Sequence, residues 1–401
     1  MLITRREWLS MAAAAPLIGR AASREREQRI GRLIAAYEEQ GIHRTATNVD
    51  RLSAEWLAGE TAKAGLTPVL EPFLLSRVDP IAAFLVARDR RIDGVPLFDA
   101  SFTGAAGVSG HLGAVAGGAD IGLVSAVPNT AGGGPLGEAR RAGRHRALVC
   151  VTRGDRPGLC PSNADSFLKP FGPPVLQVSS DDSAFLEDCA RQGAVVRVVT
   201  HVDRTHAEAF NVTARLGGAD STHPLVVMTP RSGWWSCVSE RGGGIACWLE
   251  LMRELEPARR ARDVVFVASS GHELGHLGIN AFVDGRPGIV AKSASWMHFG
   301  ANIGAAQNPG NTIQASDDDL EKKQADAMGA VGLAITRRNP RGAIPGGEAE
   351  VVHRGGGRYI SVIGRSALFH NPADRGPAAV DAGVIARFVD AFTIVAKALA
   401  Q

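Results

Sequence analysis

Three consecutive stretches decide the fold: HPLVVMT (residues 223–229), GGIACWLELMREL (243–255) and RDVVFVASS (262–270). The first and third are near-continuous apolar runs, which are typical of strands buried on both faces of a sheet. In the stretch between them, apolar side chains from Ile245 to Leu255 recur at helical spacing. A strand, a helix and a strand at this spacing form a parallel crossover unit. The sequence therefore predicts an α/β fold with a mixed, mostly parallel sheet that helices cover on both faces.

The composition is that of an ordinary globular protein, with 45% hydrophobic and 21% charged residues among 401. The 44 Lys and Arg residues exceed the 41 Asp and Glu residues by only three. Because nucleic acids and anionic membranes select strongly basic surfaces, this balance indicates neither as a partner.

Residues 1–21 have the features of a twin-arginine export signal. Arg5 and Arg6 precede a short apolar run, and Gly19 and Ala21 are small residues of the kind that a signal peptidase requires. An amphipathic helix is the alternative interpretation. No other segment reaches the roughly 18 uninterrupted apolar residues of a membrane helix. We therefore expect a periplasmic or secreted protein with no stable membrane span after signal removal.

The rest of the chain divides into three regions. Residues 22–78 contain two amphipathic helices. Residues 79–206 alternate short apolar runs with Gly- and Pro-rich segments, which indicates a compact, strand-rich insert. Residues 207–401 contain the three stretches quoted above and end in a long amphipathic helix. We expect the first and third regions to form one domain that the insert interrupts.

The third stretch runs into SSGHELGHLG (269–278), which contains the His-Glu-x-x-His pattern of zinc proteases. That pattern works when His272 and His276 point the same way from one helix. Here it follows a strand directly, and Gly275 costs a helix about 1 kcal/mol. A third ligand from a following helix is also hard to supply, because no Glu occurs between Glu273 and Glu321. We therefore place His272 and Glu273 at the end of a strand, where open α/β sheets bind ligands.

The segment DVVFVASSGHELGHLGINAFV (263–283) resembles the strand and loop of the co-catalytic zinc aminopeptidase family, which also contains glutaminyl cyclases. Three further segments resemble that family: LVVMTPRSGWWSCVSERGGGIACWLELMREL (225–255), WMHFGANIG (296–304) and FHNPADRGPAAVD (369–381). The resemblance implies a zinc aminopeptidase-like catalytic domain for residues 22–78 and 207–401. It also implies that residues 79–206 are a protease-associated domain.

The resemblance assigns site residues as well. It aligns Glu240, Glu273 and His370 with the ligands of one zinc ion. It places His272 at the general base and His298 at a metal-binding aspartate. Thr229-Pro230-Arg231 stands where the family has His-x-Asp, and the permanent charge of Arg231 would disfavour a second dication nearby. We therefore expect one zinc ion.

Several roles stay open at this point. His272 could relay a proton at neutral pH, or His272 or His298 could itself bind the metal. Arg231 could clamp a substrate carboxylate or pair with a nearby acid. Trp234 and Trp235 could line a substrate pocket or belong to the core.

The function expected from these residues is that of an exported single-zinc hydrolase of peptide or amide bonds, acting on a peptide or a small amide. A cyclising or acyl-transfer enzyme with the same single zinc is one alternative. The other is an inactive member of the family that acts as a binding protein. The substitutions at the aligned ligand positions give the second alternative its weight.

Overall fold

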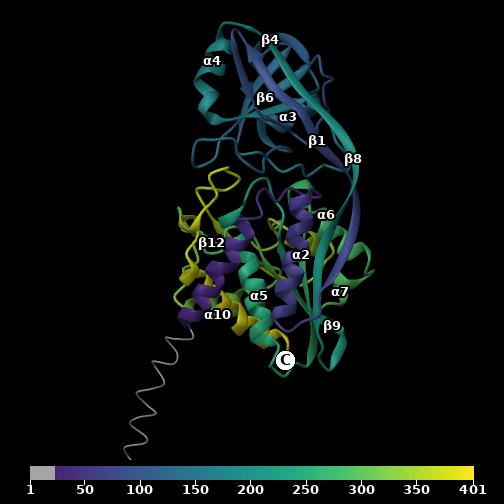
Figure 1. The fold of residues 1–401 in the computed structure, drawn as a ribbon, viewed down its shortest axis with the longest axis vertical. Helices are drawn as coiled ribbons and strands as arrows, with labels where there is room; N and C mark the ends of the chain where they lie inside the picture. The colour runs from purple at the N-terminus through teal and green to yellow at the C-terminus, as the bar shows by residue number, and fades with distance from the viewer. Residues whose placement is uncertain (1–22) are drawn as a thin grey trace, which may run out of the picture.

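The computed structural model describes residues 23–401 and has two lobes joined by a long antiparallel ribbon (Figure 1). The ribbon consists of β1 (Val69–Ala87) and β8 (Val195–Leu216), which pair along nearly their whole length. Each strand runs through both lobes, so the upper lobe is an insert held on two continuous strands. The predicted limits at residues 79 and 206 both fall within this ribbon. The predicted export signal lies outside the described residues.

The lower lobe contains the crossover unit that the sequence predicts. The strand β9 (Asp220–Pro230), the helix α5 (Gly243–Leu255) and the strand β10 (Arg262–Ser269) follow one another, and the two strands pair in parallel. The sheet continues from β9 through β11 (Ser295–Phe299) to β14 (Tyr359–Arg365), again in parallel. Its order is β13-β12-β14-β11-β9-β10-β8, with antiparallel neighbours toward both ends.

Helices cover both faces of this sheet. On one face, α5 packs with α2 (Asn48–Lys63) and α10 (Ala382–Leu399) into the largest apolar core. On the other, α6 (Leu277–Asp284) and α9 (Ala349–Arg354) cover a smaller core around Trp296. The mixed α/β class with two covered faces is therefore confirmed, and the strand ends are left free to carry a site.

The upper lobe contains five short strands in the order β4-β5-β6-β7-β3, flanked by two helices. In this lobe β4 also pairs with β8, and the short strand β2 pairs with β1. Strand-rich structure is what the Gly- and Pro-rich region predicts, whereas its kinship with protease-associated domains stays a prediction. The bounds in this lobe are β2 (Arg90–Asp93), β3 (Val95–Pro96), β4 (Val108–Ala114), β5 (Ile121–Ala126), α3 (Gly134–Ala142), β6 (Ala147–Thr152), β7 (Val175–Val178) and α4 (Ser183–Arg191).

The lower lobe is completed by an N-terminal helix over residues 23–38 and by short elements near the sheet. Among the helices that the structure describes, none combines the length and the apolar character needed to cross a membrane. The remaining elements are α7 (Ile289–Lys292), β12 (Gly310–Ala315), α8 (Asp318–Ala330), β13 (Arg337–Arg338) and the short turns of helix η1 (Ser180–Asp182), η2 (Val238–Gly242), η3 (His272–Leu274) and η4 (Pro377–Ala379).

Candidate functional site

The loop after β10 does not form the helix of a zinc protease. After Ser270 the backbone takes a left-handed step at Gly271 (φ 83°), makes one turn of 3-10 helix, and takes two more such steps at Gly275 (φ 76°) and His276 (φ 61°). The helix α6 begins only after that. A left-handed conformation costs a non-glycine residue about 1–3 kcal/mol and is often found at functional sites. The interpretation of this motif as a strand end is therefore confirmed.

This loop nevertheless brings its two histidines to one carboxylate. Among the described residues, the one group of three or more potential metal-binding side chains whose ligand atoms lie within 4.8 Å of one another is His272, His276 and Glu348. Nδ1 of His272 donates to Oε1 of Glu348 at 2.8 Å, which leaves Nε2 of His272 free. In the described part of the chain neither ring nitrogen of His276 makes a hydrogen bond. Two imidazoles and one carboxylate thus converge with unused lone pairs.

Glu348 is also held by His298, at the end of a directed chain of hydrogen bonds. Gln314 donates to the hydroxyl of Ser361 at 3.1 Å, and that hydroxyl lies 2.8 Å from Nδ1 of His298. Nε2 of His298 then donates to Oε2 of Glu348 at 3.0 Å. A Cβ on Gly347 would lie 2.7 Å from the His298 ring, so this close approach requires glycine. We call His272, His276, His298 and Glu348 the pocket cluster.

The pKa shifts in the pocket cluster favour a charged Glu348 beside neutral His272 and His276. Burial would raise the pKa of Glu348, but His272, His298 and His276 more than offset it, and the pKa lies well below its usual value. Burial and the positive charge of Arg241 lower the pKa of His272, and burial lowers that of His276. This is the protonation state in which imidazole and carboxylate bind metals.

A pocket of about 390 Å³ opens above His272 and His298. One wall comes from β14, including Ile363, and from the loop after it, including Phe369, and the other comes from loops of the upper lobe, including Asn129. The site therefore lies at the carboxyl ends of strands and between the two lobes, which is a common place for a ligand pocket.

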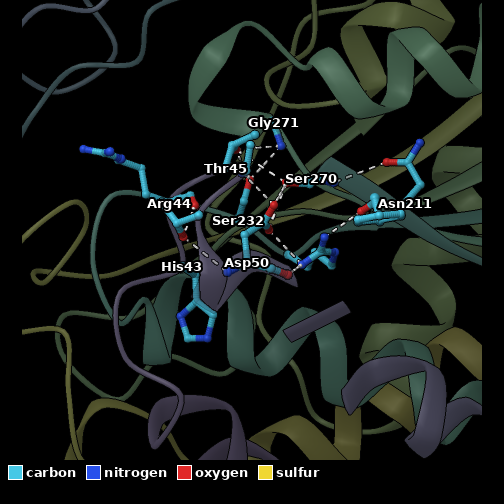
Figure 2. Close-up of polar contacts among 12 residues, drawn as sticks. His43, Arg44, Thr45, Asp50, Asn211, Ser232, Ser270 and Gly271 are labelled. Atoms are coloured by element: carbon cyan, nitrogen blue, oxygen red, sulfur yellow. Dashed lines mark hydrogen bonds and ion pairs between the residues drawn. The ribbon is translucent and has the colours of Figure 1, made fainter. Parts of the chain in front are cut away.

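Glu273 points away from the pocket cluster into a second polar cluster. Its carboxylate accepts hydrogen bonds from the amide and hydroxyl of Thr45 (2.8 and 2.7 Å) and from the hydroxyl of Ser232 (2.7 Å). The Ser232 hydroxyl in turn accepts the amide of Gly271 at 2.8 Å. Figure 2 shows Thr45 and Ser232 converging on Ser270 and Gly271. This cluster ties residues near the N-terminus of the lower lobe to the loop that carries His272.

Arg231 lies on the same side as Glu273. Its guanidinium is fully buried, pairs with a carboxylate oxygen of Asp50 at 2.8 Å and donates to the carbonyl of Phe210 at 2.6 Å. Asp50 also accepts from the hydroxyl of Ser270. Of the two roles left open for Arg231, the structure therefore shows the pairing with a nearby acid. We call Thr45, Asp50, Arg231, Ser232 and Glu273 the buried network.

Glu240 and His370 come together as expected, but Glu273 does not join them. Oε1 of Glu240 lies 3.4 Å from Nε2 of His370 and 2.7 Å from Nη2 of Arg241. Glu240 lies in the π-helical turn η2 (Val238–Gly242), whose amides at Ser239 and Glu240 donate to the carboxylate of Asp374. The charge beside this pair is therefore Arg241, not Arg231. Zinc ligation by Glu240, Glu273 and His370 together stays a prediction, and the geometry does not favour it.

Trp234 and Trp235 line a different cleft, which is also about 390 Å³ in volume. Trp234 is buried edge-on against Phe98 and donates to Asn163 at 3.1 Å. Trp235 donates to the carbonyl of His370 at 2.8 Å. Neither side chain lines the pocket above His272.

Two residues of the site escaped the sequence analysis, and a third, His276, was set aside there together with the zinc-protease pattern. Glu348 lies in the loop before α9, far along the chain from His272, and has no spacing that marks it. Arg241 directly follows Glu240 and resembles any charged residue at the start of a helix. The one local signal for Glu348 was the preceding Gly346-Gly347 pair, which permits a close approach of the backbone.

Comparison with known proteins shows likeness of fold without likeness of sequence. No protein-family model matches the chain, and no curated protein matches it in sequence. Among solved structures, a zinc aminopeptidase from Bacillus subtilis matches with a TM-score of 0.75 at 16% identity, over 93% of this chain and 94% of that one. An aminopeptidase from Aneurinibacillus sp. strain AM-1 matches with a TM-score of 0.70 at 13% identity, over 94% of each chain.

A peptidase M28 precursor from Shewanella amazonensis SB2B matches with a TM-score of 0.70 at 14% identity, over 96% of this chain and 97% of that one. These matches extend over nearly the whole chain. The chain has the fold of the zinc aminopeptidases, and the resemblance that the sequence predicts is confirmed at the level of the fold.

Proposed function

We propose that the chain is a metal-dependent hydrolase of peptide or amide bonds, with one zinc ion held by His272, His276 and Glu348. The observation that carries the proposal is the convergence of these three side chains, within 4.8 Å, below the pocket at the strand ends. Two histidines and one glutamate are an established donor set for catalytic zinc. The fold shared with zinc aminopeptidases supports the choice of bond.

The side chains present fit such an ion. Glu348 is held ionised by the imidazoles around it, and the lowered pKa values of His272 and His276 keep their lone pairs available at neutral pH. Nδ1 of His272 already faces Oε1 of Glu348 at 2.8 Å, and the ring nitrogens of His276 are not engaged by other described groups. A zinc ion with three protein ligands polarises a carbonyl group and makes water a better nucleophile at neutral pH.

The remaining residues orient and enclose the site. His298, fixed as a donor by Ser361 and Gln314, sets the orientation of the Glu348 carboxylate. Such supporting hydrogen bonds typically contribute 10–100-fold to metal affinity or activity. The upper lobe closes one side of the pocket and would exclude water from a bound peptide.

The two ring nitrogens of His272 have different surroundings. Nδ1 faces Oε1 of Glu348 at 2.8 Å, so an ion bound by both residues would lie against Nδ1 in place of its proton, whereas Nε2 points away from Glu348 and could accept a proton. The geometry supports the role of ligand, which was one of the two open roles, and makes proton relay the alternative. In either role His272 stands where the related enzymes carry a glutamate, by the resemblance described above.

We also propose that the hydrolase is exported. The twin arginine at Arg5 and Arg6, followed by an apolar run, supports this proposal. Replacing both arginines with lysine should keep a tagged protein in the cytoplasm of a bacterial host. Export that continues unchanged would contradict a twin-arginine route.

The test of the hydrolase is metal content together with activity on a panel of aminoacyl and N-acyl amides. The parent should contain about one equivalent of zinc after supplemented expression, and His276→Ala should lose both metal and activity. His223→Ala is the matched control, since His223 is exposed and pairs only with groups near Asp220. A parent protein without bound metal would contradict the proposal. A parent with metal but no activity on any amide of the panel would favour another bond or the cyclising reaction.

A further inference from the structure

The pair Glu240 and His370 is left unused by the proposed metal site. Oε1 of Glu240 and Nε2 of His370 face each other at 3.4 Å, and each residue is 1% exposed. Within the described part of the chain, neither of these two atoms has a hydrogen-bond partner. Buried polar atoms in native proteins are almost always paired, so this pair requires an explanation.

The position of the proton on a neutral His370 ring is set from its other ring nitrogen. Nδ1 lies 2.6 Å from the carbonyl oxygen of Pro161, which can only accept, so Nδ1 carries a proton. In a neutral imidazole, Nε2 then presents a lone pair to the carboxylate of Glu240. Two such acceptors repel each other unless a cation lies beside them. Their separation is close to the distance of about 3.3 Å between two ligands of a tetrahedral zinc ion.

Arg241 supplies a cation at this point. Its Nη2 lies 2.7 Å from the same oxygen of Glu240, and its Nε donates to the carbonyl of Ser232 at 2.7 Å. Neither terminal nitrogen makes a directed hydrogen bond to the described residues, so the guanidinium acts here mainly through its charge. Burial would raise the pKa of Glu240, but the charge of Arg241 is the largest of the effects that offset it, and the pKa stays well below the ordinary value.

We infer that Arg241 is the resident cation of the Glu240–His370 pair and takes the place of a second metal ion, so that the chain binds one ion and not two. A guanidinium remains charged under all ordinary conditions, and a dication beside it would be repelled. The inference rests on the proposed function for the first ion, at His272, His276 and Glu348.

The test is the metal content of Arg241→Ala. Removing the guanidinium leaves a carboxylate and an imidazole facing each other in a buried space. We expect bound zinc to rise from about one to about two equivalents per chain, and added zinc to raise the Tm of this variant more than that of the parent. Arg241→Lys keeps the positive charge and should stay at about one equivalent. The difference in zinc content between Arg241→Ala and the parent tests the inference, whereas the zinc content of the parent itself tests the proposed function.

Arg140→Ala is the matched control. Arg140 is also buried and pairs with an acid, Asp99, but it lies in the upper lobe, so its removal should not change the metal content. A parent with two equivalents, or a folded Arg241→Ala with no more metal than the parent, would overturn the inference. If Arg241→Ala does not fold, Glu240→Gln tests the inference in its place. Because the Glu240–His370 pair is inferred to hold no metal in the parent, Glu240→Gln should keep the metal content of the parent, and a loss of metal would overturn the inference.

Discussion

His272 and Glu273 are neighbours in the chain, yet their side chains enter two polar clusters of different character. In the buried network, the Glu273 carboxylate is surrounded by donors from Thr45 and Ser232. In the pocket cluster, Nε2 of His272 and the ring of His276 have lone pairs that no described group uses. A fully satisfied cluster stabilises one conformation, whereas a cluster with unused ligand atoms beside a pocket can bind something.

The difference explains why the two halves of a single motif are assigned different roles. His272 and Glu273 are successive residues of the single 3-10 turn η3, so their side chains leave the backbone about 120° apart. The left-handed steps at Gly275 and His276 then return the His276 ring to the side of His272. Mutations in the two clusters should therefore separate binding from stability.

The largest effect is expected for Glu348→Ala. It removes the proposed carboxylate ligand and leaves His272 and His298 without their common acceptor. Bound zinc should fall below about a tenth of an equivalent, and amide hydrolysis should fall by at least about 100-fold. Elemental analysis and steady-state rates measure both. Glu350→Ala on the adjacent helix, where Glu350 pairs with Arg354, is the control and should keep both properties.

Glu273→Ala should affect stability and spare the metal. It leaves the buried amide of Thr45 and the hydroxyl of Ser232 without their acceptor, at a cost of about 3 kcal/mol in the free energy of unfolding. Urea unfolding measures this cost, and the surface variant Glu138→Ala should stay within about 0.5 kcal/mol of the parent. Loss of zinc from a folded Glu273→Ala would instead support the ligand role that the resemblance implies.

Asp374, like Glu273, is a buried carboxylate that accepts hydrogen bonds from the protein, here from the amides of Ser239 and Glu240. Burial raises its pKa to about 6, although those amides act against the shift. Between about pH 4 and pH 6 the folded state therefore binds more protons than the unfolded state. The contribution of Asp374 to stability is full below about pH 4 and is lost as the pH rises through 6.

Asp374→Asn removes this titration. The stability of the parent relative to the variant should fall by about 2 kcal/mol between pH 4 and pH 7, as followed by urea unfolding at each pH. The exposed Asp93→Asn serves as the control for the general effect of charge. A difference between parent and Asp374→Asn that does not change with pH would show that Asp374 keeps an ordinary pKa.

The fold could be predicted because it depends on local patterns that the sequence carries directly. The apolar runs of β9 and β10 and the helical spacing of α5 each indicate one element, and their order fixes the parallel crossover. The left-handed loop was also predictable in outline, because Gly271 precedes the motif and Gly275 lies within it. The long strands of the ribbon were harder to delimit, because each belongs to two lobes and no local pattern marks the point where it passes from one to the other.

The partners of the site residues could not be predicted in the same way. Glu348 meets His272 only because the loop before α9 folds back over the sheet, and no spacing in the sequence encodes that contact. Alignment to a family assigns a position and not a side-chain direction, so Glu273 was given the role of a ligand. Arg231 and Arg241 both follow strand β9, and only the packing of Asp50 and Glu240 decides which guanidinium reaches the site.

The smallest effect is expected at Trp234, which was a candidate for substrate binding. Trp234→Phe keeps the ring against Phe98 and loses the hydrogen bond to Asn163, which should cost about 1 kcal/mol of stability. Because Trp234 does not line the pocket above His272, kcat/KM on the best amide should change by less than about twofold. Phe369→Leu, which alters the pocket wall, should raise KM by about 3- to 10-fold. A larger effect of Trp234→Phe than of Phe369→Leu would mean that substrate enters through the cleft of the two tryptophans, and that the two clusters are approached from the opposite side.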